Sequence, residues 1–284
     1  MKRLRPARPE LEDIAAYDAK DVRAEVRLSA NENPHNLPGE ILDKLADRVR
    51  RDIDFNRYPD PLCAHLRTMI AEANGLEPTN VLVGNGGDEL ILDLVLAWGG
   101  PGRTLVDLPP TFAMYGIDAR ITGTGVIEVP RLADFSVDAD ALMRVVAEHD
   151  PDIIVISNPN NPTGSYCEVD EIRSFLKKFR GLLVVDEAYI DFYGGTSTEL
   201  VDEFDNVIVT QSMSKSYSLA GLRIGFAVAS LDIIRGLMKI KDSYNVDVLA
   251  TAGRGEIMPQ KSTDFYPKAV AGLVMMPVEG AEGL

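Results

Sequence analysis

Residues 152–157 (Asp-Ile-Ile-Val-Ile-Ser) and residues 182–186 (Leu-Leu-Val-Val-Asp) are the two stretches that decide the fold. Each is a short apolar run rich in β-branched residues, which is typical of a strand buried on both faces. The segment between them, residues 168–179, carries apolar residues at helical spacing. Because a strand, a helix and a second buried strand form a βαβ unit, the two strands are expected to be parallel.

The same alternation of strands and helices extends outward over most of the chain. Further strands are expected at residues 80–84, 104–108, 125–129, 206–211 and 224–230. Further helices are expected at residues 88–98, 112–120 and 137–149. The sequence therefore predicts an α/β fold with a mostly parallel central sheet and helices on both faces.

Three regions are expected along the chain. Residues 1–37 look like an N-terminal arm with a short strand at residues 26–29, and residues 38–247 form the large α/β domain. Residues 248–284 lose periodicity and contain frequent glycine and proline, so an irregular segment is expected there.

The composition of the 284 residues is that of a globular protein, with 45% hydrophobic and 26% charged residues. The net charge of −15, from 29 Lys and Arg against 44 Asp and Glu, argues against non-specific binding to nucleic acid or to anionic membranes. No apolar run is long enough to span a bilayer. The two cysteines, Cys63 and Cys167, are too few for a disulfide framework, so we expect free thiols and a cytoplasmic protein.

Polar residues follow two of the expected strands, at the edge where ligands bind in open parallel sheets. Asn161 lies in the run 158–164 (Asn-Pro-Asn-Asn-Pro-Thr-Gly), whose amides could donate to a ligand, although a rigid Asn-Pro turn is an equal alternative. Asp186 ends the next strand, and a carboxylate there needs a partner such as a pyridinium nitrogen. Tyr189 follows three residues later. The alternatives for Asp186 are a metal-binding aspartate and a helix N-cap.

Two weaker signals precede helices. Residues 84–89 (Gly-Asn-Gly-Gly-Asp-Glu) include Gly87 and Asp88, and glycines before a helix N-terminus let the backbone approach an anion. An ordinary Asp N-cap is the alternative. Phe112, at the start of a helix, could stack on a planar ring or simply belong to the core.

Lys215 stands among small hydroxyl side chains shortly after an expected strand. Ser212 and Ser214 precede it, and Arg223 follows eight residues later. An amine in such a setting can form a Schiff base with an aldehyde, and hydroxyls with a guanidinium can hold a phosphate. Together these residues suggest a pyridoxal phosphate (PLP) site.

Five segments, in this order, resemble motifs of the fold type I PLP-dependent aminotransferases, and most closely those of the histidinol-phosphate aminotransferase family. They are residues 30–34 (Ala-Asn-Glu-Asn-Pro), 56–60 (Asn-Arg-Tyr-Pro-Asp), 158–164, 186–189 (Asp-Glu-Ala-Tyr) and 214–223. The resemblance covers residues 29–250 and implies a PLP enzyme that exchanges an amino group between glutamate and imidazole-acetol phosphate in histidine biosynthesis.

The resemblance also implies a role for each matching residue. Lys215 would be the Schiff-base lysine and proton shuttle, Asp186 the partner of the ring nitrogen, and Asn161 with Tyr189 the ligands of the ring oxygen. Phe112 would stack on the ring. The cofactor phosphate would be held by Gly87, Asp88, Ser212, Ser214 and Arg223.

The same resemblance implies a homodimer, because Tyr58 in such enzymes reaches the phosphate of the neighbouring subunit. A packed aromatic beside Pro59 is the alternative for Tyr58. Asn33 and Tyr17 would lie near the substrate, an amino donor or a keto acceptor.

The chain departs from the family pattern at its end. The family has a small C-terminal α+β domain with an arginine that grips the substrate, and residues 248–284 contain no recognisable version of it, so we expect this domain to be truncated. The alternatives are an aromatic aminotransferase, a threonine-phosphate decarboxylase, or a chain that folds without turning over substrate. A nucleotide-binding protein has little support, because the sequence has no Gly-x-x-x-x-Gly-Lys-Ser/Thr loop.

Overall fold

The computed structural model describes residues 7–8, 11, 14 and 29–252 of the chain. Most of the strand expected at residues 26–29, and the tail beyond residue 252, lie outside these described residues.

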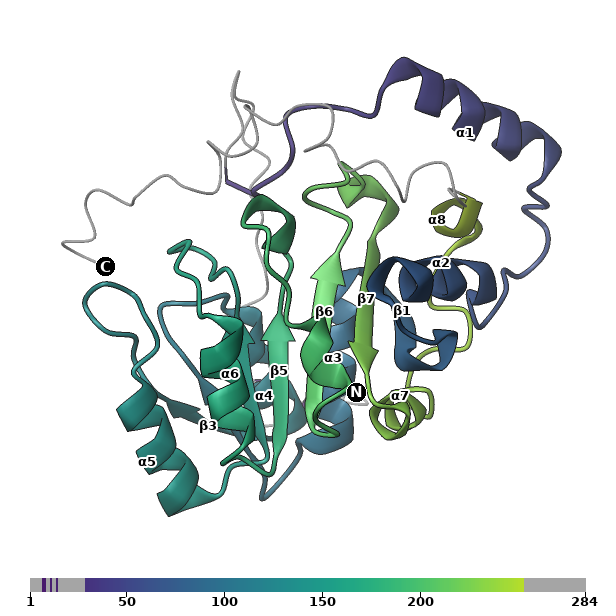
Figure 1. Ribbon diagram of the computed structural model, residues 1–284. Helices are drawn as coiled ribbons and strands as arrows, with labels where there is room; N and C mark the ends of the chain where they lie inside the picture. Colours follow the sequence, from purple (N-terminus) through teal and green to yellow (C-terminus); the bar gives the residue numbers. More distant parts are fainter. Residues whose placement is uncertain (1–6, 9–10, 12–13, 15–28, 253–284) are drawn as a thin grey trace, which may run out of the picture.

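A seven-stranded sheet forms the centre of the described part, in the order β1-β7-β6-β5-β4-β2-β3 (Figure 1). The strands are β1 (Val81–Asn85), β2 (Thr104–Asp107), β3 (Gly125–Glu128), β4 (Ile153–Ser157), β5 (Leu182–Asp186), β6 (Val207–Ser212) and β7 (Ile224–Ala229). Neighbouring strands from β3 to β6 are parallel, and only β7 runs antiparallel to both of its neighbours. The predicted α/β fold with a mostly parallel sheet is therefore confirmed.

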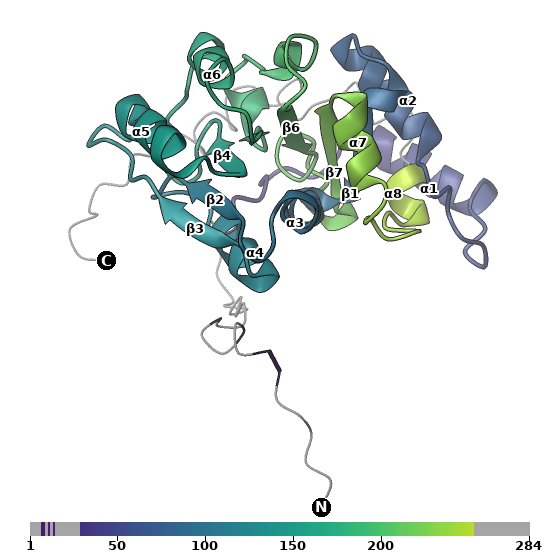
Figure 2. The ribbon, with the colours of Figure 1, turned by 90° about the horizontal axis from the view of Figure 1, so that it is seen from below.

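Helices cover both faces of this sheet, with α5 and α6 on one face and α3 and α4 on the other (Figure 2). The helices are α1 (Gly39–Arg51), α2 (Ala64–Asn74), α3 (Gly86–Trp98), α4 (Met114–Thr122), α5 (Ala139–His149), α6 (Val169–Leu176), α7 (Leu231–Leu237) and α8 (Val248–Ala252). Single 3-10 turns connect several elements: η2 (Pro78–Asn80), η3 (Ile190–Phe192), η4 (Thr198–Val201) and η5 (Ala220–Leu222).

The core forms two layers because alternate residues of each strand point to opposite faces. Ile154 and Leu183 belong to the core layer that includes residues of α2, α5 and α6, whereas Val155 and Val184 belong to the layer that includes residues of α3, α4 and α7. All five residues of β4 and of β5 are buried, as expected for central strands covered on both sides.

The reversal of β7 determines which chain segments meet at the carboxyl edge of the sheet. Gly225 of β7 pairs with Ser212 at the end of β6, and the preceding residue, Ile224, pairs with Asn85 at the end of β1. Strands β1 and β6 therefore point the same way and end at the same edge of the sheet, on either side of β7. As a result the start of α3, directly after β1, lies next to the loop that follows β6.

One short element differs from the sequence-based expectation. Residues 248–252 form the helix α8, where an irregular segment was expected to begin. The carboxylate of Asp247 accepts hydrogen bonds from the backbone N–H groups of Leu249 and Ala250, at 2.7 and 2.9 Å, and so caps the helix.

Both cysteines are free and buried, which confirms the expectation of free thiols. Within the described residues, every helix is too short or too polar to cross a bilayer.

Candidate functional site

A cavity of about 490 Å³ opens at the carboxyl edge of the sheet, where β4, β5 and β6 end and α3 begins. Every residue predicted to bind a cofactor, except Tyr58, lines this cavity: Gly87, Asp88, Phe112, Asn161, Asp186, Tyr189, Ser212, Ser214, Lys215 and Arg223. These residues are up to 136 positions apart in the chain, so the fold gathers them into one site.

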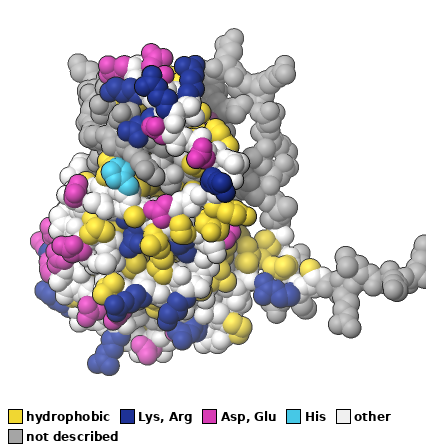
Figure 3. Space-filling model, turned by 90° about the vertical axis from the view of Figure 1, so that its right-hand side faces the viewer, with side chains coloured by type: hydrophobic (Ala, Val, Ile, Leu, Met, Phe, Trp, Pro, Cys, Tyr) yellow, Lys and Arg dark blue, Asp and Glu magenta, His cyan; other side chains and the backbone are white. Residues whose placement is uncertain are grey.

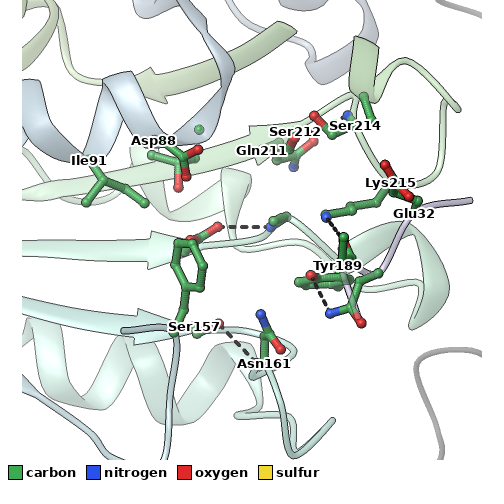
Figure 4. Close-up of a pocket in the computed structure, with 18 of the residues that line it drawn as sticks. Glu32, Asp88, Ile91, Ser157, Asn161, Tyr189, Gln211, Ser212, Ser214 and Lys215 are labelled. Atoms are coloured by element: carbon green, nitrogen blue, oxygen red, sulfur yellow. Dashed lines mark hydrogen bonds between the residues drawn. The ribbon is translucent and has the colours of Figure 1, made fainter. Parts of the chain in front are cut away.

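Lys215 lies on the loop after β6, and its side chain extends across the cavity toward Tyr189 (Figure 4). Its Nζ donates to the carbonyl oxygen of Ala30 at 3.2 Å and lies 5.6 Å from the centre of the Tyr189 ring. Burial lowers the pKa of the Lys215 amine, and the positive charge of Arg223 lowers this pKa further, while Asp88 opposes the shift. A lowered pKa increases the fraction of neutral amine, which is the nucleophilic form.

Asp186 ends β5 and is buried, with 8% of its surface exposed. Its Oδ2 accepts a hydrogen bond from the Tyr115 hydroxyl at 2.7 Å, and its Oδ1 accepts one from the Ala188 N–H at 3.0 Å. Burial raises the pKa of the Asp186 carboxyl, although these hydrogen bonds oppose the shift. Within the described residues its carboxylate forms no ion pair, so the cavity offers a place for a cationic partner.

The opposite end of the cavity is suited to an anion. Arg223 pairs with Asp88 at 3.2 Å, and its other terminal nitrogen donates to the Ser214 hydroxyl at 3.3 Å. No side chain caps α3, so the first N–H groups of this helix, including those of Gly87 and Asp88, are available to a ligand.

Glycine is required at two positions that form this end of the cavity. Gly86 has a φ of 83°, and a Cβ there would lie 2.5 Å from the Arg223 guanidinium. A Cβ on Gly225 would lie 2.5 Å from the backbone of Gly86, so β7 and the start of α3 can approach each other only without side chains.

Three further cofactor-binding candidates, Asn161, Tyr189 and Phe112, also line the cavity. The backbone N–H of Asn161 points to the Ser157 hydroxyl at 3.4 Å, and the Tyr189 hydroxyl accepts from the Asn31 amide at 3.0 Å (Figure 4). The ring of Phe112 meets the ring of Tyr115 edge-on, with 5.6 Å between their centres.

Of the three other predicted residues, Tyr58 and Asn33 do not line the cavity. Tyr58 is 79% exposed and stacks on Tyr244, with 4.3 Å between the ring centres. The amide of Asn33 donates to the backbone carbonyl of Lys215 at 3.3 Å, so it supports the lysine loop from outside. Tyr17 lies outside the described residues.

Sequence reasoning missed Tyr115 and Glu187. Tyr115 lies on α4, three positions after Phe112, which lies just before the helix. Glu187 directly follows Asp186 but points away into the protein, where it is 1% exposed.

Glu187 connects the cavity wall to the loop after β5. Its carboxylate accepts hydrogen bonds from the Thr196 hydroxyl at 2.6 Å, the Ser197 N–H at 2.6 Å and the side chain of Gln211 at 2.9 Å. Gln211 itself lines the cavity. Burial raises the pKa of Glu187 to about 7.

These groups fit the chemical needs of PLP. The cavity combines a buried amine, a buried carboxylate for a ring nitrogen, an aromatic wall, and a helix N-terminus with a guanidinium for a phosphate. The cavity also has a volume within the usual range for small-molecule sites.

Comparison with known proteins gives a consistent family assignment. The family model described as aminotransferase class I and II matches residues 23–260. The chain is 39% identical over 245 residues to histidinol-phosphate aminotransferase 1 of Carboxydothermus hydrogenoformans, covering 86% of this chain and 69% of the relative. It is 39% identical over 290 residues to a chloroplastic histidinol-phosphate aminotransferase of Arabidopsis thaliana, covering 98% of this chain and 68% of that protein.

A solved structure shares the fold. The histidinol-phosphate aminotransferase of Sinorhizobium meliloti, crystallised with pyridoxal-5'-phosphate, superposes with a TM-score of 0.83 at 22% identity. The match covers 95% of this chain and 74% of the solved chain.

Proposed function

Because the chain belongs to the class I and II aminotransferases, a PLP-dependent family, we propose that it transfers an amino group from glutamate to imidazole-acetol phosphate, giving histidinol phosphate and 2-oxoglutarate. The relatives with that printed name, at 39% identity, support this choice of reaction over other aminotransferase chemistry. Histidine biosynthesis is the corresponding pathway.

In this proposal residues at the end of β5 and beside the start of α4 would hold the ring of the cofactor. Asp186 pairs with the ring nitrogen, Asn161 and Tyr189 donate to the ring oxygen, and Phe112 stacks on the ring face. The buried carboxylate of Asp186 supports this orientation, because a cationic ring nitrogen offsets the cost of burying a charge.

Residues at the N-terminus of α3 and on the loop after β6 would hold the phosphate of the cofactor. Gly87 and Asp88 donate through their backbone N–H groups, and Ser212, Ser214 and Arg223 donate through their side chains. Supporting this placement, Arg223 is already oriented by Ser214 and Asp88, so little side-chain entropy is lost when it binds an anion.

Lys215 is the residue that carries the chemistry. When bound, PLP supplies an electrophilic carbon for amines and an electron-withdrawing ring. Lys215 holds the cofactor through its Nζ and, once released by the amino donor, moves a proton at the substrate Cα. The lowered pKa of the buried amine supports both roles.

The substrate and the assembly follow from the same proposal. Asn33 and Tyr17 lie near the substrate, and Tyr58 of each subunit reaches the cofactor phosphate of the neighbouring subunit in a homodimer. The exposure of Tyr58 supports a role at a contact between subunits.

The single observation that carries the proposal is that Lys215, Asp186 and Arg223 line one cavity in a chain of this family. The test is an assay of the PLP-loaded protein with glutamate and imidazole-acetol phosphate, in which 2-oxoglutarate and histidinol phosphate are measured. Aromatic 2-oxo acids and threonine phosphate serve as competing substrates.

We expect turnover with imidazole-acetol phosphate, loss of turnover in Lys215→Ala, and unchanged turnover in Lys178→Ala, which removes an exposed lysine after α6. Preferred turnover of an aromatic 2-oxo acid would contradict the substrate. PLP binding without transamination of any acceptor would contradict the activity.

A further inference from the structure

Building on the proposed function, we propose that Tyr115 is a positioning residue whose hydroxyl keeps the Asp186 carboxylate ionised and oriented toward the ring nitrogen of the cofactor. No family motif in the sequence pointed to Tyr115, and its role follows from the contacts it makes in the folded protein.

The contact between the two side chains is short and completely enclosed. Tyr115 lies on α4 and is 1% exposed, and its hydroxyl is 2.7 Å from Oδ2 of Asp186, which is 71 positions away at the end of β5. When Asp186 is ionised its carboxylate can only accept hydrogen bonds, so the Tyr115 O–H is then the donor. A hydrogen bond to a charged group of this kind is among the stronger ones in proteins.

Both oxygens of Asp186 accept hydrogen bonds from the protein. Oδ2 accepts from Tyr115, and Oδ1 accepts from the Ala188 N–H at 3.0 Å. Since the two carboxylate oxygens have four lone pairs, one acceptor position remains even with the Thr210 hydroxyl as a further donor. These donors therefore fix the rotation of the carboxylate while leaving an acceptor position for a cavity ligand.

The hydroxyl of Tyr115 counteracts the effect of burial on the pKa of Asp186. Burial raises the pKa of Asp186, and the Tyr115 hydrogen bond is the largest influence in the opposite direction. The Ala188 N–H and the Thr210 hydroxyl lower this pKa to smaller extents, whereas the charge of Asp88 at the start of α3 raises it. Lys215 and Tyr189 also face the cavity near Asp186.

The Tyr115 hydroxyl remains a hydrogen-bond donor over the whole pH range in which the Asp186 carboxyl titrates. Burial raises the pKa of Tyr115 well above its ordinary value, and the negative charge of Asp186 adds to this effect. Without the hydroxyl, Asp186 would take up a proton more readily, and a neutral carboxylic acid cannot pair with a cationic ring nitrogen.

The ring of Tyr115 makes a second contact at the site. It packs edge-on against Phe112, with an angle of 80° between the ring planes. One buried side chain therefore touches both the carboxylate and the aromatic wall of the cavity. Replacement by phenylalanine keeps the packing and removes only the hydrogen bond, which makes the role of the hydroxyl separable.

The direct test is the titration of the Asp186 carboxyl by ¹³C NMR in the full-length chain, before PLP is added, with the resonance assigned by its loss in Asp186→Asn. We expect Tyr115→Phe to move the titration midpoint to higher pH. Replacing Tyr115 by 3-fluorotyrosine, whose hydroxyl is a stronger donor, should move the midpoint to lower pH. Tyr166→Phe, a matched change outside the cavity, should leave it unchanged. An unchanged midpoint in both Tyr115 variants would overturn the inference.

A double-mutant cycle on PLP affinity extends the test to the cofactor. Tyr115→Phe should weaken PLP binding about tenfold at pH 7.5 in the wild-type background and have almost no effect in the Asp186→Asn background. Equal losses in both backgrounds would mean that the hydroxyl acts independently of Asp186 and would overturn the inference. Failure of the wild-type chain to bind PLP would instead contradict the proposed function, and the carboxyl titration would then decide the role of Tyr115 by itself.

Discussion

At the scale of single residues, burial shifts three ionisable side chains beside the cavity toward their neutral forms. The pKa of Lys215 is lowered by burial, the pKa of Asp186 is raised by burial, and burial raises the pKa of Glu187 to about 7. Such groups lower the stability of the free protein, and this cost is typical of sites that bind charged ligands.

Glu187 makes the free energy of unfolding depend on pH, and its raised pKa determines the sign of this dependence. In the unfolded chain the carboxyl ionises near 4.5, whereas in the folded protein it keeps its proton up to a pKa of about 7. Between these pH values the folded state binds more protons, so the free energy of unfolding falls as the pH rises, by up to about 3 kcal/mol. We expect Glu187→Gln to remove this decrease.

Urea unfolding at several pH values between 5 and 8 measures the effect of Glu187→Gln. Burial also raises the pKa of Asp93, Asp107 and Asp118 to about 6 and raises the pKa of Asp186, so the contribution of Glu187 is read as the difference between the wild type and Glu187→Gln. The exposed Glu148→Gln on α5 is the control and should behave as the wild type. If Glu187→Gln loses stability between pH 6.5 and 7.5 as steeply as the wild type, Glu187 is not the titrating group.

At the scale of elements, the periodicity of the sequence was sufficient to predict the strands but not their directions. An apolar run such as residues 224–230 looks the same in a parallel and in an antiparallel strand, because both faces are covered in either case. The antiparallel direction of β7 is set by its pairing with β1 and β6. These pairings join residues far apart in the sequence and leave no local signal.

The same reasoning explains which site residues could be predicted. Asp186 and Asn161 stand out because polar side chains end apolar strands, and Lys215 stands out because of its hydroxyl-rich neighbours. Tyr115 has no such signal, since an aromatic residue on the inner side of a helix is normally part of the core. Its partner is 71 positions away, and only the packing of α4 against the sheet brings the two together.

Helix α5 offers a test of stability that is independent of the cavity. Its N-cap Asp138 accepts a hydrogen bond from the Ala141 N–H at 2.8 Å. Asp138→Ala should reduce the free energy of unfolding by about 1 kcal/mol, because the first turn of the helix loses its cap, while PLP affinity stays unchanged. Asp138→Asn keeps a capping oxygen and should retain most of the stability. Equal losses in both variants would contradict the capping role.

At the scale of the whole molecule, one side exposes apolar side chains. Phe55 is 64% exposed, Tyr58 is 79% exposed, and Leu62 follows on the same connection between α1 and α2 with 46% exposed. Figure 3 views the side that carries α1, α2 and α8, and shows hydrophobic side chains grouped among charged ones. Exposed aromatic residues in such a setting favour a contact between subunits.

The proposed homodimer predicts that Tyr58→Ala weakens self-association about tenfold or more, because buried tyrosines often dominate the binding free energy of an interface. Sedimentation equilibrium of the PLP-loaded protein measures the dissociation constant of the dimer. The matched control is Tyr193→Ala, which removes another exposed tyrosine that stacks on a neighbouring ring, that of Tyr166, at 3.7 Å. A wild-type chain that stays monomeric, or a Tyr58→Ala variant that associates normally, would contradict the homodimer.

The central claim is that Lys215 binds PLP covalently, and chemical trapping tests it most directly. The full-length chain is incubated with PLP, reduced with borohydride and digested, and the modified peptide is identified by mass spectrometry. The account predicts that reduction fixes one PLP to Lys215, and that Lys215→Ala abolishes the labelling while Lys178→Ala does not. Stoichiometric labelling of a different lysine, or undiminished labelling of Lys215→Ala, would contradict the account.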